Sequence, residues 1–162
     1  MNKAKVSPAR QNSKELLEKW MRRLRESQFA HYESSKALGQ SNYLLGIPAV
    51  ILSTLVGTSI FASLGETVAP STQILVGIIS VLAATLGALQ TFLGFSERAA
   101  KHRAVAARYG SARRRVEELL AVYGEAVAPE EISALRKEID SIAEEAPDVA
   151  DRIWMRTEKK LD

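Results

Sequence analysis

The sequence predicts an all-α membrane protein, in which a hairpin of two transmembrane helices joins long amphipathic cytoplasmic helices that form a helical bundle. Three observations lead to this fold class. Every residue between Lys36 and Glu66 is uncharged, and every residue between Glu66 and Glu97 is uncharged again. Each stretch contains the roughly 20 mostly apolar residues that a helix needs to cross about 30 Å of hydrocarbon. Lysine and arginine gather on the outer flanks of the two stretches and are absent from the segment that joins them.

The N-terminal region is expected to be a short lead followed by an amphipathic helix. Residues 1–12 are polar and have no periodicity, so they are predicted to be disordered, and Ser13 is suited to cap a cytoplasmic helix over residues 13–42. One face of this helix repeats at spacings of four and three. Its members are Leu17, Met21, Leu24, Gln28, His31, Ser35 and Leu38.

Residues 43–96 form the predicted hairpin, with spans at about 44–64 and 73–95. Gly39 and the Gly46-Ile47-Pro48 step interrupt the start of the first span. Because proline removes a backbone donor and clashes with the preceding turn, we expect a kink or a new helix start there. Ser71 or Thr72 is expected to cap the second span after the connecting turn.

The region 97–162 is predicted to be helical and cytoplasmic. The second span is expected to continue without a break to the stop at Gly124, carrying a seam with coiled-coil-like spacing. Pro129 is suited to open a further helix, and Pro147 with Asp148 is expected to open a last short one. The seam comprises Val105, Tyr109, Ala112, Val116, Leu119 and Tyr123; the apolar stripe of the next helix comprises Ile132, Leu135, Ile139 and Ile142; the last helix carries Val149, Ile153 and Trp154.

The charge distribution predicts the topology. Residues 1–36 hold nine Lys or Arg against four Glu, residues 98–115 hold seven and no acid, and residues 117–162 hold thirteen Asp or Glu against six basic residues. The positive-inside rule then places both termini in the cytoplasm and Glu66 outside. A soluble protein with two buried core helices is disfavoured, because such helices rarely run this long without a charge.

Small residues repeat at spacings of three and four along one face of the second span. Close approach of helices in lipid depends on such residues, because packing drives association there. The stripe serves either to pack the two spans of one chain or to join subunits, and the sequence leaves both open. Its members are Gly77, Ser80, Ala84, Gly87, Thr91 and Gly94.

Polar side chains inside the spans are few. Gln90 is the most polar, and Thr54 and Thr58 come next as candidates to line a water path. No Asp, Glu, Lys, Arg or His lies in either span. A proton relay, a voltage sensor and an ion-coupled transporter are therefore disfavoured.

Nothing in the sequence indicates an enzyme, a metal site or a cofactor. Cysteine is absent, so no disulfide or thiolate ligand can form. His31 and His102 lack metal-ligand spacing, and His31 is expected to pack on the seam of the bundle. Neither a phosphate-binding glycine loop nor a catalytic pair of acids is recognisable.

A basic run leaves the second span. It could attract anionic lipid headgroups or hold a nucleotide or nucleic acid. The favoured interpretation is that it sets the topology and forms salt bridges between subunits with the acidic tail, so no nucleic-acid partner is expected. The run comprises Arg98, Lys101, Arg103 and Arg108, followed by Arg113, Arg114 and Arg115.

Over about Leu16 to Tyr123 the chain resembles the SLATT domain, a two-transmembrane effector domain associated with bacterial nucleotide-signalled conflict systems. Most of the match is the hairpin with helical flanks. The resemblance implies a pore-forming effector in the bacterial inner membrane, triggered by a separate sensor protein or a nucleotide. The residues that carry it are Ala30-His31, the run Leu44 to Pro48, Gly57-Thr58, Glu97, His102 and Tyr109.

Two functions remain open. One is a homo-oligomeric pore in the lipid bilayer, lined by Gln90, Thr54 and Thr58, with Arg98, Lys101, Arg103 and Arg108 at a cytoplasmic mouth that favours anions. The other is a non-conducting membrane anchor whose cytoplasmic helices bind a partner. Because two helices cannot enclose a water path, the first requires several chains.

Overall fold

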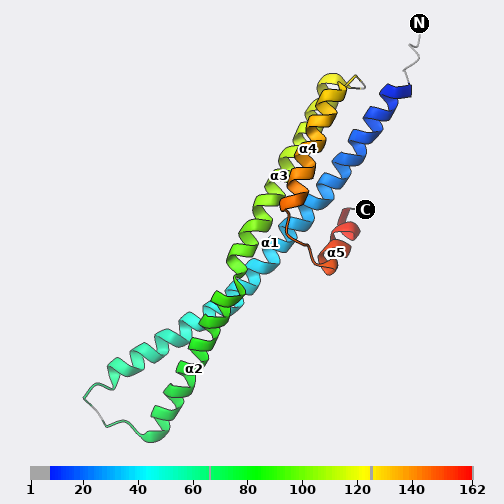
Figure 1. Cartoon of the computed structure of the whole chain (residues 1–162). Coiled ribbons are helices and arrows are strands. Elements are labelled where there is room, and N and C mark those ends of the chain that lie inside the picture. The colour runs from blue at the N-terminus through cyan, green and yellow to red at the C-terminus, as the bar shows by residue number, and fades with distance from the viewer. Residues whose placement is uncertain (1–7, 66, 125, 162) are drawn as a thin grey trace. The chain divides into compact units, whose positions relative to one another are not determined.

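The computed structural model describes residues 8–65, 67–124 and 126–161, with side chains from residue 13 onward. All regular secondary structure in these ranges is helical, as the sequence predicts. The five helices, coloured from blue to red in Figure 1, are α1 (Pro8–Ala62), α2 (Pro70–Leu93), α3 (Phe95–Tyr123), α4 (Pro129–Glu145) and α5 (Asp151–Leu161). Two of the helical stretches are long and apolar enough to cross a membrane.

The chain divides into two compact units. The terminal unit comprises residues 1–35 and 100–162, and the central unit comprises residues 36–99. The first part of α1, most of α3, and α4 and α5 belong to the terminal unit. The rest of α1 and all of α2 form most of the central unit.

The core of the terminal unit lies between α1, α3 and α4. The predicted seam of α3 is buried from Val105 to Leu119, whereas Tyr123 at its end is 53% exposed. On α4, Leu135 and Ile142 are buried, and Ile132 and Ile139 pack against the same core. The predicted seam of α3 therefore packs within the chain.

The helix ends follow local chemistry at three places. Gly124 has a φ of 56° and ends α3, as predicted, because glycine adopts the left-handed conformation without a Cβ clash. Pro129 opens α4, also as predicted. Gly94 has a φ of 55° and separates α2 from α3, so the expected unbroken helix through this point is wrong.

Three other boundaries differ from the expected ones. Helix α1 begins at Pro8 instead of Ser13, and residues 1–7 of the predicted disordered lead lie outside the described ranges. Ala69, and not Ser71 or Thr72, is the N-cap of α2, because Pro70 is preorganised for the first helical position. Helix α5 begins at Asp151, which leaves Val149 in the preceding segment.

Helix α1 runs through Gly39, Gly46 and Pro48 without interruption, so the predicted new helix start is wrong. Proline costs one backbone hydrogen bond in a helix interior. Ending the helix there would instead leave about four carbonyls and four N–H groups unpaired at the two new ends. In a long apolar segment, which offers few side chains to satisfy those groups, the continuous helix loses less.

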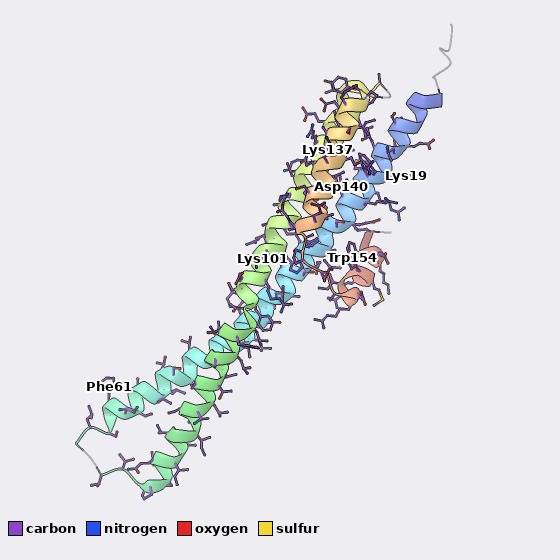
Figure 2. All side chains as sticks on the ribbon, viewed as in Figure 1. Lys19, Phe61, Lys101, Lys137, Asp140 and Trp154 are labelled. Atoms are coloured by element: carbon purple, nitrogen blue, oxygen red, sulfur yellow. The ribbon has the colours of Figure 1, made fainter. Side chains whose placement is uncertain are left out.

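The central unit has little interior of its own. In its described part, only Ala49 and Ala83 are buried, each with 7% of its surface exposed. Large apolar side chains point outward, and Phe61, labelled in Figure 2, is 76% exposed. These exposed apolar helices contrast with the packed core of the terminal unit.

Candidate functional site

The predicted pore-lining amide of Gln90 lies within the central unit against the other helix of that unit. Its Nε2 donates to the Asn42 side-chain oxygen at 3.3 Å. A Cβ at Gly46 would lie 2.7 Å from the same nitrogen, so glycine is what lets the amide approach α1 this closely. Gln90 therefore joins α2 to α1 through a polar contact inside one chain.

The hydroxyls of Thr54 and Thr58 bond to their own helix. Thr54 Oγ1 donates to the Val50 carbonyl at 2.9 Å, and Thr58 Oγ1 donates to the Thr54 and Leu55 carbonyls at 3.0 Å. The same arrangement recurs at Ser80, Thr85 and Thr91 on α2. These side chains satisfy their donors without water or a second helix, which suits an apolar environment.

The predicted stripe of small residues on α2 is largely uncovered. A Cβ built at Gly77 or at Gly87 would meet nothing within 4 Å, and Ala84 is exposed. Gly94, the last member, serves as the left-handed end of α2. Within the chain, packing on α1 uses a neighbouring part of the helix that includes Ala83 and Gln90.

The basic residues divide into two groups. Arg98, Lys101 and Arg103 have exposed side chains. Arg108 forms an ion pair with Glu145 on α4, and its Nη2 donates to Ser141 Oγ at 3.4 Å. The acidic C-terminal region is therefore an ion-pair partner of α3 within the chain, and the predicted salt bridges between subunits stay a prediction.

Arg115 makes the second connection between α3 and α4. Its guanidinium donates to Glu138 at 2.9 Å and to Glu131 at 3.2 Å. These hydrogen bonds, Glu138 first, raise the pKa of Arg115. The guanidinium is thus held as a permanent cation between two carboxylates of α4.

A pair of histidines lies at the end of the terminal unit from which both chain connections to the central unit leave. His31 of α1 and His102 of α3 are 3% and 5% exposed, and their Nδ1 atoms are 2.9 Å apart. One ring must carry a proton on Nδ1 and donate it, and the other must accept. Burial first, and the neighbouring His102 second, lower the pKa of His31 to about 4. The His31 imidazole is therefore neutral at pH 7.

Tyr109 completes this cluster. Its ring centroid lies 5.6 Å from that of His31 and it is only 7% exposed. Burial raises the pKa of its phenol, so the hydroxyl stays protonated. In the described ranges, no group of three or more His, Cys, Asp or Glu side chains could hold a metal ion.

The sequence indicated a packed position for only one of the two histidines. His31 was expected on the seam of α1, but His102 was not assigned a partner. Its position three residues before Val105 and seven before Tyr109 continues the seam spacing of α3 backward. Extending that pattern by one step would have placed both histidines on facing buried stripes. His31, His102 and Tyr109 are also among the residues that carry the SLATT resemblance, and the fold brings them together.

Comparison with family models, with curated proteins and with solved structures finds no match to this chain. The functional argument therefore rests on the residues and contacts described above.

Proposed function

We propose that this chain is a homo-oligomeric membrane effector that permeabilises the bacterial cytoplasmic membrane. In this proposal α2 and the second half of α1 cross the bilayer as a hairpin, with both termini in the cytoplasm. The terminal unit is then the cytoplasmic helical bundle. The resemblance to the SLATT domain motivates the permeabilising activity and its use in antiphage or conflict defence, with a separate sensor protein or a nucleotide as the trigger.

One observation carries the oligomeric part of the proposal. The surface of the central unit combines exposed large apolar side chains with a stripe of small residues in which a Cβ at Gly77 or Gly87 would meet nothing within 4 Å. Apolar side chains are stable against lipid, and small residues allow a second helix to approach closely. A second copy of the chain is the simplest neighbour for that face.

The topology is argued from charge. Lys36 and Arg98 flank the central helices on the side of the terminal unit, and Glu66 is the only ionisable side chain in the connecting segment. Reporter fusions at residue 68 and at the C-terminus test the orientation. A cytoplasmic signal from the loop fusion contradicts it.

The activity is tested with purified protein in lipid vesicles that contain a fluorescent dye. We expect dye or ion efflux from the unmodified chain and a loss of efflux in Gly87→Leu, which fills the uncovered face. Thr85→Leu is the matched control, because it adds leucine to an exposed position on another face of α2. A monomer in mild detergent, or equal effects of the two variants, contradicts assembly through the stripe.

Conduction is a separate part of the proposal. Gln90, Thr54 and Thr58 are the candidates to line the path, and Arg98, Lys101 and Arg103 would make its cytoplasmic mouth favourable to anions. Planar-bilayer currents from the unmodified chain and from Gln90→Leu test this. Unchanged conductance in Gln90→Leu removes Gln90 from the path.

The alternative is a non-conducting membrane anchor whose terminal unit binds a partner. The hydrogen bonding of the central unit favours it, since Gln90 is engaged with Asn42 and the threonine hydroxyls with their own helix. These contacts leave few polar groups to line a water path. Absence of current and of growth arrest on induced expression supports the anchor over the effector.

A further inference from the structure

The terminal unit contains a cleft of about 260 Å³ between α1, α3 and α4. Helix α1 contributes Trp20, Arg23 and Ser27, α3 contributes Tyr109, and α4 contributes Arg136 and Asp140. Figure 2 shows Asp140 on the part of α4 that lies beside α1. Ligand pockets for small molecules combine an apolar wall with a few placed polar groups, and this cleft has both.

The apolar wall of the cleft includes the aromatic side chain of Trp20, which packs against the buried core. Trp20 is partly buried and packs against the same core that contains Leu24 and Tyr109. Ile139 lines the same cleft from α4. Because Trp20 is partly buried and also lines the cleft, its indole is suited to stack on a planar ring.

Two hydroxyls that line the cleft have no partner in the described part of the chain. Ser34 and Ser41, on the same helix as Ser27, donate to carbonyls four residues earlier, whereas Ser27 makes no such bond. The Tyr109 hydroxyl also lacks a hydrogen bond, although 93% of this residue is covered, given its 7% exposure. Neither oxygen is buried away from solvent, so both hydroxyls are free to donate to an acceptor placed in the cleft.

The charge of the cleft favours an anion. Arg23 has no ion-pair partner within the described ranges, and it faces the cleft from α1. Arg136 faces it from α4, and its Nε lies 3.6 Å from an Asp140 oxygen, a separation too long for a strong hydrogen bond. Two guanidiniums and one carboxylate give a net charge of +1.

We propose that this cleft binds a small planar anion, in which an aromatic ring stacks on Trp20 and a phosphate or carboxylate lies between Arg23 and Arg136. The oxygens of that group accept from the two guanidiniums, and the Tyr109 and Ser27 hydroxyls donate to the remaining acceptors. The volume suits a mononucleotide or an aromatic carboxylate. Binding is independent of the proposed membrane activity, because it requires only the folded terminal unit of the intact chain.

The experiment is a fluorescence titration of the full chain in detergent. The sequence has two tryptophans, so Trp154→Phe leaves Trp20 as the only indole reporter. Adenosine monophosphate and 4-hydroxybenzoate are the probes, one for each source of the anion. Adenosine, which lacks the anion, and inorganic phosphate, which lacks the ring, are the ligand controls.

We expect saturable quenching of Trp20 by at least one of the two probes, and its Kd should rise about tenfold or more in Arg23→Gln and in Arg136→Gln, since each removes a charge-assisted hydrogen bond. Arg22→Gln and Lys137→Gln change the same charge at the adjacent exposed positions, which do not line the cleft. They should leave the Kd unchanged. A response to adenosine monophosphate alone identifies a phosphate ester as the ligand, and one to 4-hydroxybenzoate alone identifies a carboxylate.

Asp140→Asn provides a second measurement, in which the expected change is tighter binding instead of weaker binding. Removal of this carboxylate should tighten the binding of an anion several-fold. Weaker binding in Asp140→Asn, adenosine that binds as tightly as its monophosphate, or no quenching by either probe at millimolar concentration overturns the proposal. Urea midpoints of all variants, read from Trp20, show whether they remain folded.

Discussion

The terminal and central units are both built from helices with apolar faces, but they treat those faces in opposite ways. In the terminal unit, Leu17, Val116 and Leu135 are fully buried. In the central unit, Leu44 is 76% exposed and Phe92 is 86% exposed. The hydrophobic effect in water accounts for the first arrangement, because it rewards removal of apolar surface. The second leaves apolar surface uncovered within the chain, on helices that are long and apolar enough to cross a membrane.

The polar side chains of the two units also differ in the partners with which they bond. Arg108 and Arg115 of α3 reach across to carboxylates of α4, and both pairs lie partly exposed to solvent. In the central unit, the hydroxyls of Thr54 and Ser80 return to their own helix backbone. Charged side-chain pairs between helices are found in the terminal unit, whereas most side-chain hydrogen bonds of the central unit return to the same helix and Gln90 with Asn42 is an exception.

The largest expected effect comes from the core of the terminal unit. Leu135→Ala should lower the free energy of unfolding by about 2–5 kcal/mol, because it removes buried methyl groups and leaves a cavity. Ile78→Ala on α2, where the side chain is 55% exposed, should change it by less than about 0.5 kcal/mol. Urea unfolding of the detergent-solubilised chain, followed by Trp20 fluorescence, measures both. Similar losses in the two variants would erase the contrast between the units.

The histidine pair makes the terminal unit sensitive to acid. The pKa of His31 is about 4 in the folded chain and 6.5 in the unfolded chain, so the unfolded state binds more protons between these values. The stabilising contribution is complete above pH 6.5 and is lost as the pH falls to 4, by about 3 kcal/mol in total. Urea midpoints measured across this range test the sign.

His31→Phe is the control for this effect. It should flatten the pH dependence in the upper part of the range, where ordinary carboxyl groups do not yet titrate. An equally steep loss of stability in His31→Phe and in the unmodified chain would assign the acid sensitivity to other groups.

A smaller effect is expected at the ion pairs of the terminal unit. Arg115→Gln removes the contacts to Glu131 and Glu138, whose side chains are 47% and 34% exposed. Solvent screening limits the expected loss to about 0.5–1 kcal/mol. Arg114→Gln changes the same charge on an exposed neighbour and should have no measurable effect. The difference in urea midpoint between the two variants is the quantity to compare, and raised salt should diminish it.

The smallest effect tests the polar contact of the central unit. Gly46→Ala places a Cβ where the Gln90 amide now lies and should displace it from Asn42, at a cost below about 1 kcal/mol. The side-chain amide resonance of Gln90, assigned with Gln90→Leu, should therefore shift. Gly57→Ala is the control, because nothing lies within 4 Å of that Cβ. A resonance that moves equally in both variants argues against the contact.

Local sequence signals predicted much of the helical pattern. Gly124 marks a helix end because glycine adopts a positive φ readily, and Pro129 marks a helix start because its fixed φ suits the first helical position. Both effects are local and do not depend on the rest of the fold. The apolar spacing on α4 predicted that Leu135 and Ile142 would be buried, since periodicity defines a face. The proline signal failed at Pro48, where it competed with the hydrogen bonds of a long helix, and spacing alone does not weigh the two. Gly94 ends α2 as Gly124 ends α3, so the glycine signal was present there and the expectation of an unbroken helix did not use it.

The candidate site was less predictable. Gln90 was singled out as the most polar side chain of the apolar stretches, but its neighbours Asn42 and Gly46 were not identified. His31 was placed on a seam without its partner His102. In both cases the two residues are far apart in the chain, and a pattern within one helix carries no information about the helix that faces it.

By itself, the sequence determined the helical class, the segregation of charge from two long apolar stretches, and the faces along which the helices pack. Only the tertiary structure decided what covers each face. The seam of α3 packs on α1 and α4 of its own chain, whereas a Cβ at Gly77 or Gly87 in the small-residue stripe of α2 would meet nothing within 4 Å. The physical reason is that burial of apolar surface is non-directional. An apolar stripe favours burial without selecting the surface that buries it. Shape and charge complementarity between particular helices select that surface.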